Sequence, residues 1–189
     1  MNLIFLGPPG VGKGTQAKYI CEKYNILHLS TGDILRFEID EETETGTIAK
    51  KYIDNGELVP DKILLTMMNS RLKKEDSKNG YLLDGFPRTI PQADGLDKIM
   101  KNINHKLDIV ISLTAKEDEL INRLINRGLD SGRSDDSPEI IRNRQKIYWK
   151  QTSPLLLYYK NNNFLKSVNG IGTISDITQK IINILDQYA

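Results

Sequence analysis

The chain has 189 residues, of which 39% are hydrophobic and 27% are charged, a composition typical of a globular domain. Its formal net charge of +1 gives no strong field for nucleic acid or an anionic membrane, and no apolar run is long enough to span a bilayer. The single cysteine, Cys21, excludes an internal disulfide and a zinc cluster built on thiolates. The apolar run Leu3–Leu6 is too short for an export signal, so we expect a cytoplasmic protein without nucleic-acid or membrane partners.

The chain begins with a strand, a glycine-rich turn and a helix. Leu3–Leu6 is typical of a short buried strand, the segment GPPGVGKG follows at residues 7–14, and apolar residues recur at helical spacing from Lys13 to Tyr24. This order is the context of a phosphate-binding loop, in which backbone N–H groups and a helix N-terminus face an anion. Lys13 adds a full positive charge that can follow phosphoryl oxygens. Gly14 stands where the general motif has a hydroxyl, which here follows one position later.

The rest of the chain alternates predicted strands and helices. We expect strands at residues 26–29, 81–83, 107–113 and 164–168. We expect helices at residues 36–55 with a break near Gly46, and at 63–72, 91–103, 117–127, 138–160 and 174–185. The weakly apolar segment 30–59 is predicted to be an insertion outside the main core, and residues 128–137 are predicted to form a mobile polar loop.

The alternation predicts an α/β fold of three layers, α/β/α, with a central parallel sheet of about five strands. Ligands of such sheets bind beyond the carboxyl ends of the strands. Polar, glycine-containing segments fall at three of these ends, at residues 7–15, 31–36 and 84–92. Their convergence predicts an active site at this edge of the sheet.

Carboxylate and guanidinium groups are the candidate chemical groups. Asp84 directly follows a predicted strand, where a carboxylate can hold Mg²⁺; the alternative is a turn aspartate before Gly85. Arginines lie around the same predicted cleft, and their planar guanidinium groups match phosphate oxygens. They are Arg36, Arg88, Arg123, Arg127, Arg133 and Arg144. Any one of them alone could simply be solvated at a helix end. The two histidines, His28 and His105, are interpreted as structural, and no acyl-transfer triad is visible.

These motifs resemble the nucleoside monophosphate kinases, and among them the adenylate kinase family with a short lid. The resemblance covers nearly the whole chain. It rests on residues 7–16 (GPPGVGKGTQ), 29–33 (LSTGD), 84–89 (DGFPRT) with Gln92, and 127–136 (RGLDSGRSDD). Gly14 after the lysine is usual in this family. The resemblance implies reversible, magnesium-dependent phosphoryl transfer from ATP to AMP, giving two ADP.

The resemblance also implies the site residues. ATP would bind Gly10, Val11, Gly12, Lys13, Gly14, Thr15, Arg127 and Gly172. AMP would bind Thr31, Arg36, Glu57, Leu58, Val59, Gly85, Phe86, Pro87, Arg88, Gln92, Arg133 and Arg144. Charge stabilisation during transfer would come from Lys13, Arg88, Arg123, Arg133 and Arg144. Asp84 would position hydrated Mg²⁺, and Asp135 and Asp136 would orient the lid arginines.

In this family the chain would be one kinase domain over residues 1–189, with a monophosphate-binding flap at residues 30–59 and a short lid at 128–138. The lid is brief and contains no cysteine, so zinc is not expected. Small-molecule nucleotides are the expected partners, and the resemblance suggests a monomer. Two alternatives stay open: a kinase for UMP, CMP or another monophosphate, and an ATP-sensing module that uses the loop only for binding.

Overall fold

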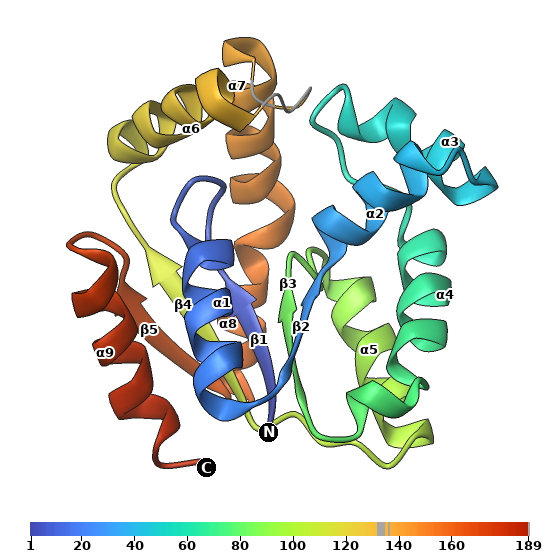
Figure 1. Ribbon diagram of the computed structural model, residues 1–189, viewed down its shortest axis with the longest axis vertical. Helices are drawn as coiled ribbons and strands as arrows, with labels where there is room; N and C mark the ends of the chain where they lie inside the picture. Colours follow the sequence, from blue (N-terminus) through green and yellow to red (C-terminus); the bar gives the residue numbers. More distant parts are fainter. Residues whose placement is uncertain (132–134, 136, 189) are drawn as a thin grey trace.

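The computed structural model describes residues 1–131, 135 and 137–188, and its centre is a five-stranded sheet of parallel strands (Figure 1). The strands are β1 (Asn2–Leu6), β2 (Leu27–Ser30), β3 (Tyr81–Asp84), β4 (Ile109–Thr114) and β5 (Leu165–Asn169), in the spatial order β2-β3-β1-β4-β5. The α/β class and the parallel sheet predicted from the sequence are confirmed.

Helices cover both faces of the sheet. One face carries α1 (Lys13–Tyr24) and α9 (Ile174–Leu185), and the other carries α4 (Asp61–Leu72), α5 (Ile90–Asn102) and α8 (Pro154–Asn161). The remaining helices are α2 (Thr31–Asp40), α3 (Glu44–Ile53), α6 (Glu117–Ser131) and α7 (Pro138–Ile147), with a 3₁₀ turn at Glu75–Ser77. Figure 1 shows α6 and α7 above one side of the carboxyl edge of the sheet, and α2 and α3 above the other.

Strand β1 divides the core because successive side chains of a strand point to opposite faces. Leu3 and Phe5 belong to the cluster under α1 and α9, whereas Ile4 and Leu6 belong to the cluster under α4, α5 and α8. All four side chains are buried. Apolar residues on both faces explain why β1 appears as a continuous apolar run rather than an alternating one.

The register of the strands brings the predicted site segments to one edge. Phe5 of β1 and Ser30 of β2 both pair with Asp84 of β3, so these three strands end together. Each end leads into a helix that begins within a few residues. Ser30 caps α2 by accepting a 3.2 Å hydrogen bond from the Asp33 N–H. The chain therefore presents several helix N-termini at the same edge.

Two helix predictions differ from the structure. The predicted break near Gly46 lies instead between Asp40 and Glu44, because Thr43 caps α3 by accepting from the Gly46 N–H at 3.0 Å. Gly46 is inside α3, where its missing side chain lets the helix pack against the backbone of Glu38.

The long helix predicted at 138–160 is also divided. Tyr148–Thr152 form a π-helical turn between α7 and α8, in which the Ser153 N–H donates to the Tyr148 carbonyl at 2.9 Å. Pro154, which has no N–H, then begins α8. The side-chain periodicity continues through this turn, which is why the sequence pattern resembles one helix.

The predicted polar loop at residues 128–137 is partly helical, since α6 continues to Ser131. Residues 132–134 and 136, which include Arg133 and Asp136, lie outside the described residues. Within the part of the chain that the structure describes, no helix has the length and apolar character needed to cross a membrane.

Candidate active site

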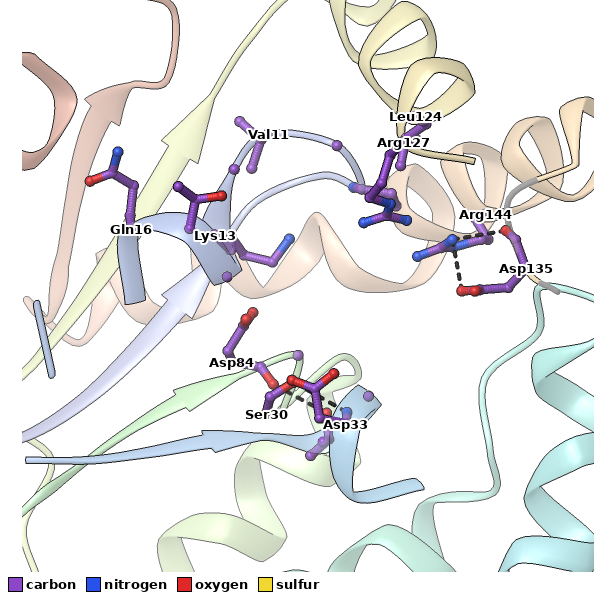
Figure 2. Close-up of a pocket in the computed structure, with 18 of the residues that line it drawn as sticks. Val11, Lys13, Gln16, Ser30, Asp33, Asp84, Leu124, Arg127, Asp135 and Arg144 are labelled. Atoms are coloured by element: carbon purple, nitrogen blue, oxygen red, sulfur yellow. Dashed lines mark hydrogen bonds and ion pairs between the residues drawn. The ribbon is translucent and has the colours of Figure 1, made fainter. Parts of the chain in front are cut away.

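A cavity of about 940 Å³ opens at the carboxyl edge of the sheet (Figure 2). This volume is near the upper end of small-molecule sites. Predicted residues from every site segment that the structure describes line it: Gly10, Val11, Gly12, Lys13, Gly14, Thr15, Thr31, Arg36, Glu57, Leu58, Val59, Asp84, Gly85, Arg88, Arg123, Arg127, Arg144 and Gly172. Gly172 follows the edge strand β5, whereas Leu58 lies between α3 and α4, so the cavity is lined by parts of the chain that are far apart in sequence.

The glycine loop between β1 and α1 forms the floor of the cavity. Gly10 and Gly12 have left-handed φ values of 85° and 96°, and a Cβ on Gly10 would lie 2.8 Å from the Leu120 carbonyl oxygen. Glycine is therefore required at position 10 both by its backbone conformation and by the close packing of α6. The loop leads directly into the N-terminus of α1, which concentrates N–H dipoles at the floor.

Lys13, the first residue of α1, is the half-buried cation beside this loop. Its ammonium group donates to the Gly7 carbonyl at 2.7 Å and to the Pro8 carbonyl at 3.2 Å. Burial lowers the pKa of Lys13 to about 8; the Asp84 carboxylate opposes this shift, while Arg88, Arg144 and Arg127 add to it. The neighbouring positive charges thus disfavour the protonated amine until an anion enters.

Two arginines reach toward the same floor from other elements. Arg88, which follows β3, donates from Nε to the Gly85 carbonyl at 2.8 Å, and burial and then the charge of Arg144 lower its pKa to about 10. Arg144 on α7 lies 2.8 Å from Asp135 Oδ2 and donates to the Asp135 carbonyl at 2.9 Å. Figure 2 shows Arg127 of α6 and Arg144 projecting toward the loop that carries Lys13. A site with this excess of positive charge is suited to a polyphosphate.

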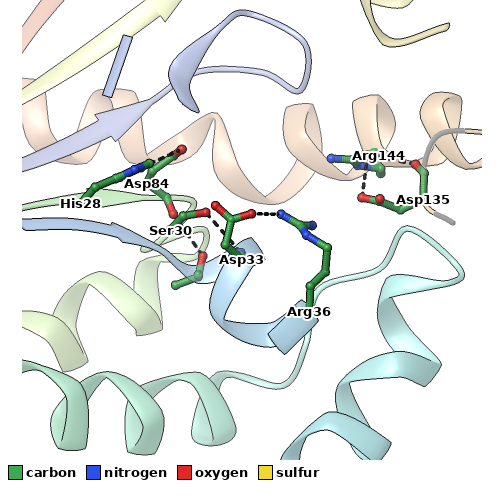
Figure 3. A network of polar contacts seen from close by, with 8 residues as sticks. His28, Ser30, Asp33, Arg36, Asp84, Asp135 and Arg144 are labelled. Carbon is green, nitrogen blue, oxygen red and sulfur yellow. Dashed lines mark hydrogen bonds and ion pairs between the residues drawn. The ribbon is translucent and has the colours of Figure 1, made fainter. Parts of the chain in front are cut away.

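Asp84 is the acidic residue of the cavity that lies at the end of β3. Its carboxylate oxygen Oδ2 lies 3.6 Å from His28 Nε2 (Figure 3), and a Cβ on Gly14 would be 3.5 Å from the same oxygen. The carboxylate therefore reaches from the end of β3 to Gly14 in the first turn of α1, and Thr15, the next residue, lines the same cavity. Carboxylate and hydroxyl oxygens are the hard donors that Mg²⁺ prefers, so these residues fit that ion. His28 also lines the cavity, a position that the strand pattern did not predict.

The segment after β2 carries Thr31 and Arg36 into the cavity. The Thr31 hydroxyl donates to the Asp84 carbonyl at 3.2 Å, which ties the start of α2 to the end of β3. Arg36 forms an ion pair with Asp33, one turn earlier on α2 (Figure 3). Leu35, Leu58 and Val59 add apolar surface to this side of the cavity, as a nucleobase pocket requires.

Three predicted residues lie behind the cavity wall. Phe86 and Gln92 are fully buried, and Pro87 lines a separate small cavity of about 70 Å³. Gln92 Oε1 accepts from the Arg88 N–H at 2.7 Å, and its Nε2 donates to Asp61 Oδ1, also at 2.7 Å. Asp61, at the first turn of α4, was not identified from the sequence because nothing local links it to Gln92.

Arg123 lies at the side of the cavity near β5. Its Nη1 donates to the Gly170 carbonyl at 3.1 Å and its Nε to Glu119 at 3.0 Å. Both Arg123 and Gly172 line the cavity. Its contact with Gly170 brings Arg123 to the segment that leads to Gly172.

Comparison with known proteins gives a consistent family match. The family profile described as "Adenylate kinase" matches residues 5–164. A curated protein named "Adenylate kinase" from Leptospira biflexa is 48% identical to this chain, over 96% of this chain and 97% of its own length. Another of that name, from Flavobacterium psychrophilum, is 46% identical over 98% of both chains. One from Methanothrix thermoacetophila is 44% identical with full coverage of both chains.

Proposed function

This chain belongs to the adenylate kinase family, and from that premise we propose that its cavity transfers a phosphoryl group reversibly between ATP and AMP, giving two ADP. The observation that carries the proposal is one cavity with a glycine loop and helix N-terminus at its floor and half-buried cations from three separate elements around it. Such an arrangement suits two phosphate chains that meet end to end.

ATP is proposed to occupy the part of the cavity over the glycine loop. The backbone of Gly10–Thr15 and the Lys13 ammonium group would hold its phosphates, with Arg127 contacting them from α6. The base would extend toward Gly172. Arg123 lines the same cavity while it is hydrogen-bonded to Gly170, and it is proposed to add to charge stabilisation during transfer, the role that the family resemblance implies.

AMP is proposed to occupy the opposite part, under residues 30–59. Thr31, Gly85 and the backbone of Glu57–Val59 would surround its base and ribose, with Gln92, Phe86 and Pro87 supporting the wall from behind. Arg36, Arg88 and Arg144 would bind its phosphate. The role proposed for Arg133 rests on the family resemblance alone.

The chemistry needs no protein nucleophile. An oxygen of the AMP phosphate attacks the γ-phosphorus in line, a new P–O bond forms, and the bond from the γ-phosphorus to the β–γ bridging oxygen breaks, which leaves ADP on both sides. Lys13, Arg88 and Arg144 stabilise the charge that moves between the two nucleotides. Closure of the flap (30–59) and the lid (128–138) is proposed to exclude water, which would otherwise accept the phosphoryl group.

Magnesium is the proposed cofactor. Asp84, with Thr15 nearby, would hold the ion, largely through water, and the bound ion would neutralise phosphate charge. A monomer is the proposed active form, as the family resemblance suggests. We also propose a cytoplasmic location.

A panel of monophosphates tests this function. Purified protein is mixed with Mg-ATP and either AMP, UMP, CMP, GMP or dAMP, and the diphosphates formed are separated and quantified. We expect AMP to be phosphorylated with the highest kcat/KM. A higher kcat/KM for UMP or CMP would assign the chain to another acceptor, and ATP hydrolysis without any diphosphate from the acceptor would reject the kinase function.

A further inference from the structure

We propose that Asn143 on α7 is a positioning residue that holds the AMP-binding segment Glu57–Val59 at a fixed distance from Arg144. The inference rests on the proposed function, because it concerns two parts of the site that AMP would contact together. It is carried by contacts between α7 and the two residues that precede Glu57.

The first contact is a hydrogen bond between residues far apart in the sequence. Asn143 Nδ2 donates to the Asn55 carbonyl at 2.7 Å. Asn55 lies just beyond the C-cap of α3, so its carbonyl group is outside the helical hydrogen-bond pattern and accepts from another element. The side chain of Asn143 supplies such a donor, and this joins the end of α3 to α7.

The second contact is the packing of α7 on Gly56. Gly56 is buried and has a left-handed φ of 66°. A Cβ at this position would lie 2.8 Å from Ile140 Cγ2 and 3.0 Å from Arg144 Cγ. Any other residue would therefore push against the stem of Arg144. The close packing of the Gly56 backbone therefore fixes the part of the Arg144 side chain nearest its own backbone, around Cγ.

Arg144 is also held at its other end. Its guanidinium group lies 2.8 Å from Asp135 Oδ2, while its stem lies over Gly56. The backbone immediately after Gly56 is Glu57, whose N–H donates to the Tyr52 carbonyl at 2.8 Å. The segment proposed to surround AMP and the arginine proposed to bind its phosphate thus form one connected unit. Because Glu57–Val59 and Arg144 are already held in place before AMP binds, less conformational entropy is lost when AMP contacts both.

Asn143→Ala and Asn143→Leu test the proposal, because both remove the N–H donor and the leucine keeps a similar size. We expect KM for AMP to rise about fivefold, the effect of losing one neutral hydrogen bond, with KM for ATP and kcat within about twofold of wild type. Amide hydrogen exchange at Gly56 and Glu57 should also become faster.

Asn55→Ala is the matched control. It removes the neighbouring side chain but keeps the backbone carbonyl that accepts from Asn143, so KM for AMP should stay at the wild-type value. The proposal is overturned if Asn143→Ala leaves both KM for AMP and the exchange of Gly56 unchanged, or if KM for AMP and KM for ATP rise equally. If wild type fails to phosphorylate AMP, the proposed function is wrong, and the hydrogen-exchange comparison still decides whether Asn143 fixes the segment.

Discussion

The Gln92 side chain donates a 2.7 Å hydrogen bond to Asp61, and through its other end it holds the backbone N–H of Arg88. A backbone N–H can only donate and a carboxylate can only accept, so the two partners fix the orientation of the amide. The Thr89 hydroxyl lies 3.1 Å from the same carboxylate. Asp61 on α4 therefore anchors the segment from which Arg88 enters the cavity.

Replacing Asp61 should weaken AMP binding although its carboxylate is not proposed to touch the nucleotide. Asp61→Ala leaves the buried Gln92 amide without its acceptor, which costs about 1–3 kcal/mol and loosens Arg88. In steady-state kinetics we expect KM for AMP to rise about tenfold and KM for ATP to change less. Asp94→Ala is the control, since Asp94 on α5 accepts from the Tyr158 hydroxyl at 2.9 Å at an exposed site. Equal kinetics for the two variants would contradict the anchoring role.

Nucleotide binding should be linked to protonation of Lys13. Burial lowers its pKa from 10.5 to about 8, so at pH 9 most of the ligand-free protein carries a neutral amine. Bound phosphates favour the charged form, and binding should therefore take up protons. Calorimetry of ATP binding in buffers of different ionisation enthalpy at pH 9 measures this uptake. Lys13→Arg, which stays charged, should show none; uptake equal to wild type in that variant would refute the assignment.

The same shift predicts how the stability of the ligand-free protein depends on pH. Between about pH 8 and 10.5 the unfolded chain keeps the Lys13 proton that the folded chain has lost, so this group makes the free energy of unfolding rise with pH. Urea unfolding of wild type and Lys13→Met across this range isolates the contribution. We expect the free energy of unfolding of Lys13→Met to exceed that of wild type by an amount that decreases as the pH rises. A difference that stays constant with pH would argue against the lowered pKa of Lys13.

Arg88 is expected to contribute mainly to turnover. Its guanidinium group is half-buried, fixed by the Gly85 carbonyl, and close enough to Arg144 that the charge of that residue lowers its pKa. Loss of one preorganised charge that stabilises a transition state costs on the order of 10²-fold or more in kcat. Arg88→Ala should show this loss in a coupled ADP assay, with thermal unfolding as the check that the fold is retained. Undiminished kcat would remove Arg88 from the charge-stabilising set.

Asp135 should orient Arg144. The two side chains are 2.8 Å apart and mostly buried, at 10% and 17% exposed. Asp135→Asn removes the charge that holds the guanidinium group while keeping the shape of the side chain. We expect kcat to fall about tenfold, because a misplaced cation stabilises the transferred phosphoryl group less well. An unchanged or higher kcat would mean that Asp135 merely competes with the substrate for Arg144.

Asp84 should set the magnesium requirement. Asp84→Asn replaces one of the two carboxylate oxygens at the end of β3 by an amide nitrogen and removes the negative charge. The Mg²⁺ concentration that gives half-maximal activity should therefore rise about tenfold or more. A titration with Mg²⁺ at saturating nucleotides gives this value, and excess chelator should abolish wild-type activity. Equal half-maximal concentrations in the two proteins would exclude Asp84 from the metal site.

Much of the fold was predictable because it depends on local patterns. The apolar run of β1, the glycine loop and the helix from Lys13 follow one another between Asn2 and Tyr24, and the alternation of elements predicts the parallel sheet. Parallel strands then bring Asp84 and the glycine loop to the same edge. For this reason the cavity unites segments that lie far apart in the sequence.

The parts that were missed depend on contacts between elements. His28 and Asp61 have no local signal: the first appears as a strand residue and the second as an ordinary helix start. Gly46 resembles a helix break, but tight packing against Glu38 accommodates it inside α3. The π-helical turn Tyr148–Thr152 adds one residue to a turn without disturbing the apolar pattern, so periodicity could not reveal it.

Phosphorus NMR of an equimolar mixture of ATP and AMP tests the central claim most directly, because it follows every phosphoryl group at once. With protein and Mg²⁺ present, the account predicts that ATP and AMP signals decline together while ADP appears at two molecules for each AMP consumed, with no inorganic phosphate. The appearance of inorganic phosphate while the AMP signal stays constant would contradict it, since the cavity would then deliver the phosphoryl group to water.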